Sequence, residues 1–288
     1  MKKLLALVLC LTGLLTPSFS ALAQTPTVSR NRLLFNSVYP MGEDEVPEDM
    51  VTLYSLSIVV SLAAIQLDRE AASFARAMFN DMIDDGITNY LVVSGYRTYA
   101  KQQQLYADKF ASYQASGYSD SEAEVLAKSI VAVPGTSEHQ SGYAMDISNT
   151  ALGGTLSGNV EQSAVGQWLK ENAWRFGYTM RYPKDKTEIT GIVYEPWHYR
   201  FVGAPHAQIL YERSLCLEEY VALTKDEGRT ISFTDAHGLS YNIAYADTLP
   251  DLDLMKDGVI VNPVAQEGSG YLVTSVTHNP IKTPLRWN

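Results

Sequence analysis

The stretch PGTSEHQSGYAMDI, residues 134–147, is the part around which this chain of 288 residues is organised. It places His139 seven residues before Asp146 and surrounds both with glycines and small polar side chains. Residues 144–147 alternate in the manner of a β-strand, so we expect Asp146 to project from a strand, which holds a functional side chain rigidly. Downstream, in the stretch YEPWHYR, Glu195 stands three residues before His198.

Two histidines, one aspartate and a separate glutamate are the side chains of a catalytic zinc site. Such a site uses three protein ligands, leaves the fourth position to water, and needs a further carboxylate to accept the proton of that water. Either short motif alone is common among solvated side chains. Their combination carries more weight because the chain has only five histidines. We expect the other three to be structural or exposed: His206, His237 and His278.

The composition is that of a globular protein. Hydrophobic residues make up 46% of the chain and charged residues 19%, which indicates neither disorder nor a protein with several membrane spans. The net charge is -10 and the isoelectric point is near 5.0, which argues against a nucleic-acid partner because such a partner requires a basic face.

The first 23 residues have the features of a secretory signal peptide. Lys2 and Lys3 precede an apolar run over residues 4–15, and Ala21-Leu22-Ala23 provides a site for cleavage. We therefore expect the protein to act outside the cytoplasm, in the cell envelope or as a secreted protein. The alternative is an uncleaved anchor, which would make the membrane a partner. After cleavage Cys216 is the single cysteine, and its apolar neighbours predict a buried thiol.

The remaining chain predicts a mixed α+β protein in three parts. We expect an extended N-terminal arm over residues 24–50, a main domain over residues 51–222 and a small β appendage over residues 226–288. In the main domain the patterns predict strands at 90–94, 144–147, 178–182 and 191–194, and helices after Asp68 and over 99–110, 121–130, 163–176 and 204–211. In the appendage they predict strands at 230–234, 239–245, 259–261 and 271–276.

Signatures of other catalytic classes are missing from the sequence. It has no Ser-x-x-Lys motif, no Gly-x-Ser-x-Gly elbow and no His-Glu-x-x-His helix. It also lacks a phosphate-binding Walker loop and a dinucleotide-binding fingerprint.

Three blocks in order resemble the VanY-type D-alanyl-D-alanine carboxypeptidases: SGYRT with Gln102 (94–102), PGTSEHQSGYAMDI (134–147) and ITGIVYEPWHYRFVG (189–203). This zinc metallopeptidase group also includes L,D-carboxypeptidases and D,D-dipeptidases, and the resemblance covers about residues 30–220. It implies a small antiparallel sheet flanked by helices, outside which the C-terminal β appendage lies.

The resemblance also implies roles for individual residues. Zinc would be bound by His139, Asp146 and His198, with Glu195 as the general base and acid. Arg97 would bind and polarise the scissile carbonyl; the alternative for Arg97 is a purely structural ion pair. Further positions near the substrate cleft are Gln102, Ser137, Tyr143 and Trp197.

The implied function is removal of the terminal D-alanine from the pentapeptide stem of peptidoglycan or its precursor. Two alternatives stay open at this point. One is an L,D-carboxypeptidase or endopeptidase acting on the same polymer. The other is a wall-binding module that kept the fold without catalysis, against which the intact set of ligands, Glu195 and Arg97 speaks.

Overall fold

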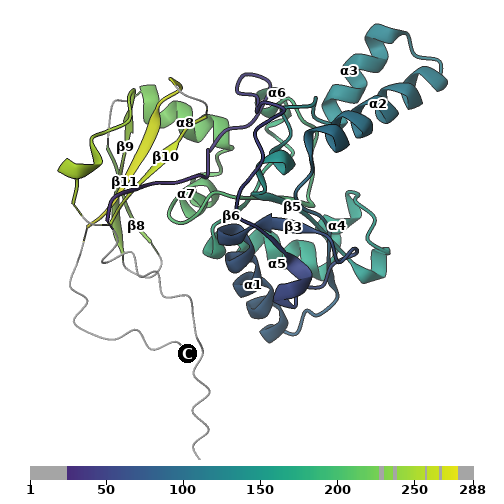
Figure 1. The fold of residues 1–288 in the computed structure, drawn as a ribbon. Coiled ribbons are helices and arrows are strands. Elements are labelled where there is room, and N and C mark those ends of the chain that lie inside the picture. The colour runs from purple at the N-terminus through teal and green to yellow at the C-terminus, as the bar shows by residue number, and fades with distance from the viewer. Residues whose placement is uncertain (1–24, 227–229, 236–238, 257, 266–267, 278–288) are drawn as a thin grey trace, which may run out of the picture.

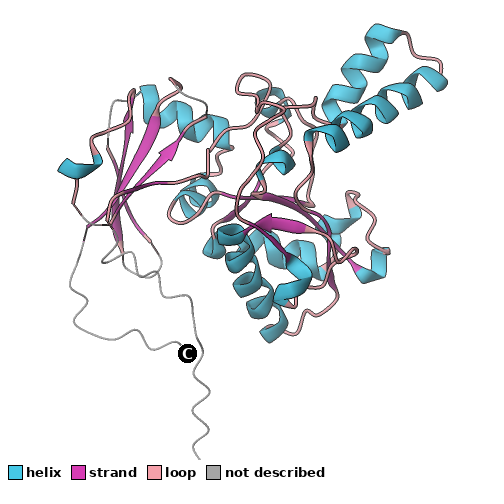
Figure 2. Cartoon of the chain, viewed as in Figure 1, coloured by secondary structure: helices cyan, strands magenta, loops and turns pink. Residues whose placement is uncertain are grey.

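The computed structural model describes residues 25–226, 230–235, 239–256, 258–265 and 268–277. Helices and small, mainly antiparallel sheets alternate along the chain, which confirms the predicted α+β class (Figures 1 and 2). The expected signal peptide, His237 and His278 lie outside the described residues. Among the helices that the structure describes, none is both long and apolar enough to cross a bilayer.

The sheet at the centre of the main part has the strand order β4-β5-β7-β6, with every neighbouring pair antiparallel. Its strands are β4 (Tyr90–Ser94), β5 (Ala144–Asn149), β7 (His198–Phe201) and β6 (Tyr178–Met180). Asp146 pairs with Ser94 on one side and with His198 on the other. Residues directly opposite each other in a sheet point to the same face, so this register brings the distant sequence blocks together.

The helix α1 (Arg69–Asp84) covers the sheet on the side away from these polar residues, together with α5 (Ala164–Asn172). Asp68 caps α1 by accepting a hydrogen bond from the backbone N–H of Glu70 at 2.9 Å, as expected for a helix start. The predicted apolar stripe is buried: Ala71, Ala75, Met78 and Met82. Two strands that the patterns did not predict, β2 (Met50–Thr52) and β3 (Gln66–Asp68), pair beside α1.

The helices α2 (Tyr99–Ala115) and α3 (Asp120–Ile130) form an antiparallel hairpin that projects from the body of the protein (Figure 1). Thr98 caps α2 through the backbone N–H of Lys101. Ser119 and Glu122 form a capping box at the start of α3. Both predicted helices are therefore confirmed, and α2 runs five residues further than expected, to residue 115 instead of 110.

Two expectations for residues 163–194 were wrong. The single helix expected over 163–176 is α5 followed by a 3-10 turn, Ala173–Phe176, with the short helix α4 (Asn159–Gln162) ahead of it. Residues 191–194 do not form a strand, because their backbone bonds elsewhere: the N–H of Val193 donates to the carbonyl of Ser129. The short helix α6 (Thr187–Thr190) precedes them. His198 therefore begins a strand instead of following the end of one.

The C-terminal part of the chain has a second hydrophobic core, separate from the core under the central sheet. The helices α7 (His206–Arg213) and α8 (Leu217–Asp226) lie against a five-stranded sheet of order β1-β10-β11-β9-β8. Its strands are β1 (Thr27–Val28), β8 (Ile231–Thr234), β9 (Ser240–Ala246), β10 (Val259–Pro263) and β11 (Tyr271–Thr277). The predicted appendage strands are thus present, and the N-terminal arm adds β1 to them.

The N-terminal arm enters this second core and does more than lie over a surface. Leu33 and Leu34 are buried there beside Leu210 and Leu217.

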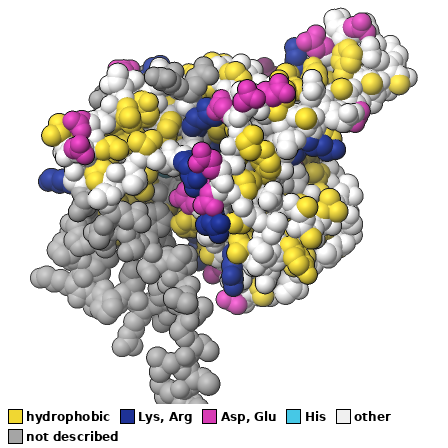
Figure 3. Space-filling view, in the orientation of Figure 1, with side chains coloured by type: hydrophobic (Ala, Val, Ile, Leu, Met, Phe, Trp, Pro, Cys, Tyr) yellow, Lys and Arg dark blue, Asp and Glu magenta, His cyan; other side chains and the backbone are white. Residues whose placement is uncertain are grey.

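Cys216 is buried, as expected. His206, which was expected to be structural or exposed, is also buried. Figure 3 shows acidic and basic side chains side by side along the strip between the β-rich part and the rest of the molecule. The boundaries at residues 50, 222 and 226 stay predictions.

Candidate active site

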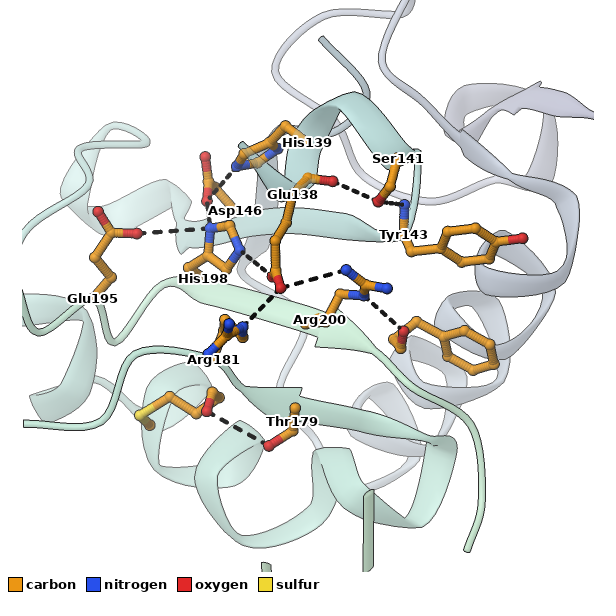
Figure 4. Close-up of polar contacts among 12 residues, drawn as sticks. Glu138, His139, Ser141, Tyr143, Asp146, Thr179, Arg181, Glu195, His198 and Arg200 are labelled. Carbon is orange, nitrogen blue, oxygen red and sulfur yellow. Dashed lines mark hydrogen bonds and ion pairs between the residues drawn. The ribbon is translucent and has the colours of Figure 1, made fainter. Parts of the chain in front are cut away.

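His139, Asp146 and His198 meet on the polar face of the sheet, and each is at least 97% buried. One ligand atom from each lies within 4.8 Å of the other two. Nε2 of His139 is 3.3 Å from Oδ1 of Asp146, and Nδ1 of His198 is 3.2 Å from the same oxygen. The three predicted ligands therefore converge on one point (Figure 4).

The turn before β5 fixes the orientation of His139. His139 lies in a 3-10 helix, Glu138–Ser141, which ends at Gly142 with φ +77°, a conformation that favours glycine. Its Nδ1 is 2.7 Å from the carbonyl oxygen of Gly95. A carbonyl only accepts, so Nδ1 carries the proton and Nε2 keeps its lone pair toward Asp146.

The unpartnered atoms fit a metal ion. Among the residues that the structure describes, Nε2 of His139 and Oδ1 of Asp146 are buried and have no hydrogen-bond partner, although buried polar atoms normally have one. The other carboxylate oxygen of Asp146 accepts a hydrogen bond from Arg97 at 3.2 Å, which leaves Oδ1 for a ligand. Two imidazole nitrogens and a carboxylate oxygen are a donor set of catalytic zinc sites.

The pKa values of the two histidines are shifted in opposite directions. Burial lowers the pKa of His139 to about 4, and the nearby Arg97 adds to this shift. Burial alone would also lower the pKa of His198, but the neighbouring carboxylates of Asp146 and Glu138 outweigh it and raise that pKa to about 9. For Asp146, burial is outweighed by both histidines, which hold the pKa of its carboxyl well below its usual value.

Glu195 stands beside the ligands without belonging to the converging set. Its Oε2 is 3.6 Å from Nδ1 of His198, and its side chain is 11% exposed. Burial raises the pKa of Glu195 to about 7, with His198 and Arg97 acting against the rise. A carboxyl with a pKa near neutrality is suited to accept and return a proton.

Arg97 lies three residues after the end of β4, and its side chain reaches Asp146 beside the other candidate ligands. Its guanidinium donates to Ser94 at 3.2 Å, to the side-chain oxygen of Gln102 at 3.0 Å and to Asp146. These three bonds use three of its five N–H donors. The amide nitrogen of Gln102 donates to the carbonyl of Ala132, so Gln102 holds Arg97 against the α2–α3 hairpin. Among the described residues nothing else accepts from the guanidinium of Arg97, so two of its donors are available for a ligand.

One cavity of about 510 Å³ encloses this arrangement. Ser137 and Trp197 line it together with Arg97, Gln102, Glu195 and the three candidate ligands. Tyr143 does not line the cavity, which corrects the expectation for this residue. It lies just before β5, and its side chain is buried in the hydrophobic core against Phe201.

Glu138 is the polar residue of the site that the sequence patterns missed. It is fully buried, its Oε2 is 3.4 Å from Nε2 of His198, and its Oε1 accepts from Arg181 at 2.7 Å and lies 3.4 Å from Arg200 (Figure 4). Glutamate side chains are usually exposed, so the sequence alone gives no reason to expect Glu138 in the interior. Its role becomes visible only from its contacts with the buried Arg181 and Arg200. The one sequence feature that could have indicated a buried Glu138 is the predominance of glycine and small polar residues around it.

The family model for VanY, described as D-alanyl-D-alanine carboxypeptidase, matches residues 64–204, which contain all of these side chains. A D-alanyl-D-alanine carboxypeptidase of Enterococcus faecium is 37% identical over 221 residues, and one of Enterococcus faecalis is 46% identical over 160 residues. The matches cover 75% and 56% of this chain, and 64% and 57% of those relatives.

Solved structures match over a larger share of their own length. VanYB in complex with D-alanine-D-alanine is 40% identical, with a TM-score of 0.57 over 67% of this chain and 97% of that one. The chain belongs to the VanY family. A variant of VanY from a VanB-type resistance cassette, also 40% identical, was solved with Zn(II), with a TM-score of 0.55 over 65% of this chain and 97% of that one. The LdcB LD-carboxypeptidase is 34% identical, with a TM-score of 0.58 over 66% of this chain and 84% of that one.

In this VanY-family chain, His139, Asp146 and His198 form a group that could hold a metal ion, and the related VanY variant was solved with Zn(II). The spacing of the ligand atoms gives a site that can hold one ion. The residues contributed by β5, β7 and the turn before β5 lie inside the matched range.

Proposed function

We propose that this VanY-family protein is a secreted zinc D-alanyl-D-alanine carboxypeptidase. Its substrate would be the pentapeptide stem of peptidoglycan or of its precursor, from which it removes the terminal D-alanine. The observation that carries the proposal is the pair of buried, unpartnered ligand atoms on His139 and Asp146, with Glu195 and Arg97 lining the same cavity.

His139, Asp146 and His198 would hold the metal through Nε2, Oδ1 and Nδ1. Zinc bound there lowers the pKa of water to about 7 and polarises a carbonyl oxygen. The orientation of both imidazoles supports this ligand set: Nδ1 of His139 donates to Gly95, and Nε2 of His198 faces Glu138. Such partners fix the ring and keep the free nitrogen toward the metal.

Glu195 would act as the general base and then as the general acid. It accepts a proton from the attacking water while the new carbon–oxygen bond forms at the scissile carbonyl. It then gives that proton to the nitrogen of the leaving D-alanine as the carbon–nitrogen bond breaks. The products are a shortened stem peptide with a new carboxyl group and a free amino acid, so atoms and protons balance.

Arg97 would stabilise the negative charge that develops on the carbonyl oxygen. An arginine keeps its charge in proteins, and fixed donors aimed at a developing oxyanion contribute strongly to catalysis. Its bonds to Ser94, Gln102 and Asp146 hold the guanidinium in place, and two donors remain. A purely structural ion pair would not place the side chain in the wall of the cavity.

The proposed location is outside the cytoplasm, because residues 1–23 have a charged start, an apolar run and an Ala-x-Ala site. An exported enzyme reaches stem peptides in the wall directly. The net charge of -10 argues against a nucleic acid as the partner.

The second candidate is an L,D-carboxypeptidase, and the likeness to LdcB favours it. Both reactions release D-alanine and differ in the length of the stem that is cut. Purified protein should therefore be incubated with stems of three, four and five residues, and the products identified by mass spectrometry. We expect the pentapeptide alone to be shortened, by one residue. Shortening of the tetrapeptide alone would replace the proposed function by the L,D alternative.

A further inference from the structure

The cavity that holds the candidate ligands continues along one face of α2. Four of its lining residues, Leu105, Asp108, Lys109 and Ser112, follow the spacing i, i+3, i+4 and i+7 that places residues on one side of a helix. Gln102 marks the near end, because it accepts a hydrogen bond from Arg97. The α2–α3 hairpin, which projects from the body of the protein in Figure 1, therefore contributes lining residues to one wall of this cavity.

The length of this wall exceeds what a single leaving residue needs. A helix rises about 1.5 Å per residue, so Gln102 and Ser112 lie about 15 Å apart along the axis. An extended peptide advances about 3.3 Å per residue, so the wall spans roughly four residues. A carboxypeptidase releases one residue on the leaving side. The α2 wall must then accommodate the part of the substrate that precedes the scissile bond.

Lys109 is the cation on this wall. It is partly buried, and its ammonium group has no hydrogen bond or ion pair among the residues that the structure describes. Its neighbour Asp108 already accepts a hydrogen bond from Gln104 at 2.7 Å. Of the described residues that line the cavity, Arg97 is the one arginine and Lys109 the one lysine. With Arg97 at the reacting carbonyl, Lys109 is available for an anionic group further along the substrate.

We infer that Lys109 belongs to a remote subsite for a carboxylate that lies two residues ahead of the residue whose carbonyl is attacked. Lys109 lies about 10 Å beyond Gln102 along α2, which matches the length of about three extended residues, counting the residue whose carbonyl is attacked as the first. In a peptidoglycan stem this place is taken by a γ-linked D-glutamyl residue, whose α-carboxyl group is either free or amidated. The inference rests on the proposed function, and it means that the enzyme prefers the stem with the free α-carboxyl group over the amidated stem.

The test compares two pentapeptides that end in D-Ala-D-Ala and differ only at that second residue. One has the free α-carboxyl group and the other its amide. We expect the wild-type protein to hydrolyse the acid with a kcat/KM about three- to fivefold above the amide, the range of a partly exposed ion pair. The variant Lys109→Met should bring this ratio to about one, and Lys109→Arg should retain it. The ratio is independent of the amount of active protein.

Lys101→Met is the matched control, since Lys101 lies on the same helix but outside the cavity. It should keep the wild-type ratio. A ratio near one in the wild-type protein, or an unchanged ratio in Lys109→Met, would overturn the subsite and leave the proposed function standing. If the wild-type protein released D-alanine from neither peptide, the proposed function would fail and the subsite with it.

Discussion

The carboxylate of Glu138 lies behind the imidazole of His198, with Oε2 3.4 Å from Nε2, on the side opposite Asp146 (Figure 4). Burial would raise the pKa of Glu138, but Arg181 and Arg200 outweigh it and hold that pKa well below its usual value. Glu138 therefore stays anionic and favours a proton on Nε2 of His198. The lone pair of Nδ1 is then directed to the candidate metal position.

The first prediction separates this role from a purely structural one. Replacing Glu138 with glutamine should weaken zinc binding by about 10- to 100-fold, the usual effect of removing a partner of a metal-binding histidine. The measurement is the dissociation constant for zinc, obtained by competition with a chelator of known affinity.

Glu218→Gln is the control for that variant. Glu218 also pairs with Arg181, at 2.8 and 2.5 Å, but no contact joins it to His198 among the described residues. Both variants remove a carboxylate from a buried arginine and should lower the free energy of unfolding. Only Glu138→Gln should change the affinity for zinc, and an equal loss in both would assign Glu138 a structural role alone.

The second prediction concerns the ligands themselves. The wild-type protein should hold one zinc ion per chain after dialysis, and the double variant His139→Ala, His198→Ala should hold none, because two of three donors are gone. Elemental analysis by mass spectrometry measures the ratio. Retention of one ion by the double variant would place the metal elsewhere.

The third prediction distinguishes Glu195 from the ligands. Glu195→Gln should keep its zinc and its melting temperature, since the side chain is isosteric and stands outside the converging set. It should lose about 10²- to 10⁴-fold in kcat, because an amide cannot accept the proton of water. Steady-state rates on the pentapeptide test this. Near-normal turnover would identify another residue as the base.

The fourth prediction concerns stability and pH, at a histidine remote from the metal site. His206 bonds through Nδ1 to the hydroxyl of Tyr220 at 2.7 Å, and burial lowers its pKa to about 4. Above pH 6.5 the histidine is neutral in both the folded and the unfolded chain. As the pH falls from 6.5 toward 4 only the unfolded chain gains the proton, so stability is lost, by at most about 1.4 kcal/mol per pH unit.

Denaturant unfolding of the wild-type protein and of His206→Gln should therefore be compared from pH 7 to pH 4.5. The contribution of the other titrating groups cancels in the difference between the two proteins. The wild-type free energy of unfolding should fall more steeply below pH 6.5 than that of the variant. Parallel curves would mean that His206 takes up its proton equally well in the folded protein.

The sequence identified His139, Asp146 and His198 as one candidate ligand set because their chemistry is local to short motifs, and the structure brings the three together. The strand at residues 144–147 places Asp146 on one face. The sequence did not predict that His198 begins a strand. Pro196 has no N–H to donate, and Val193 bonds to Ser129, so the preceding residues cannot form a ladder. Such a contact between distant segments has no signature in a local pattern.

The position of the N-terminal arm was harder to predict for the same reason. Its polar composition and prolines are typical of an exposed segment. Yet Asn31 accepts a hydrogen bond from the buried Arg200 at 2.7 Å, and Leu33 and Leu34 enter the second core. These contacts join residues about 170 positions apart in the chain. Tyr143 was misplaced by its motif, since its side chain is buried in the hydrophobic core and does not line the cavity.

The most direct test of the proposed carboxypeptidase activity is the release of D-alanine from a pentapeptide stem whose terminal carboxyl group is either free or amidated. Zinc-loaded wild-type protein should release D-alanine from the acid, leaving the tetrapeptide, and should cleave the amide far more slowly, because a carboxypeptidase recognises the free terminal carboxylate. Both products are quantified by mass spectrometry over the same time course. Equal cleavage of acid and amide would contradict the carboxypeptidase assignment.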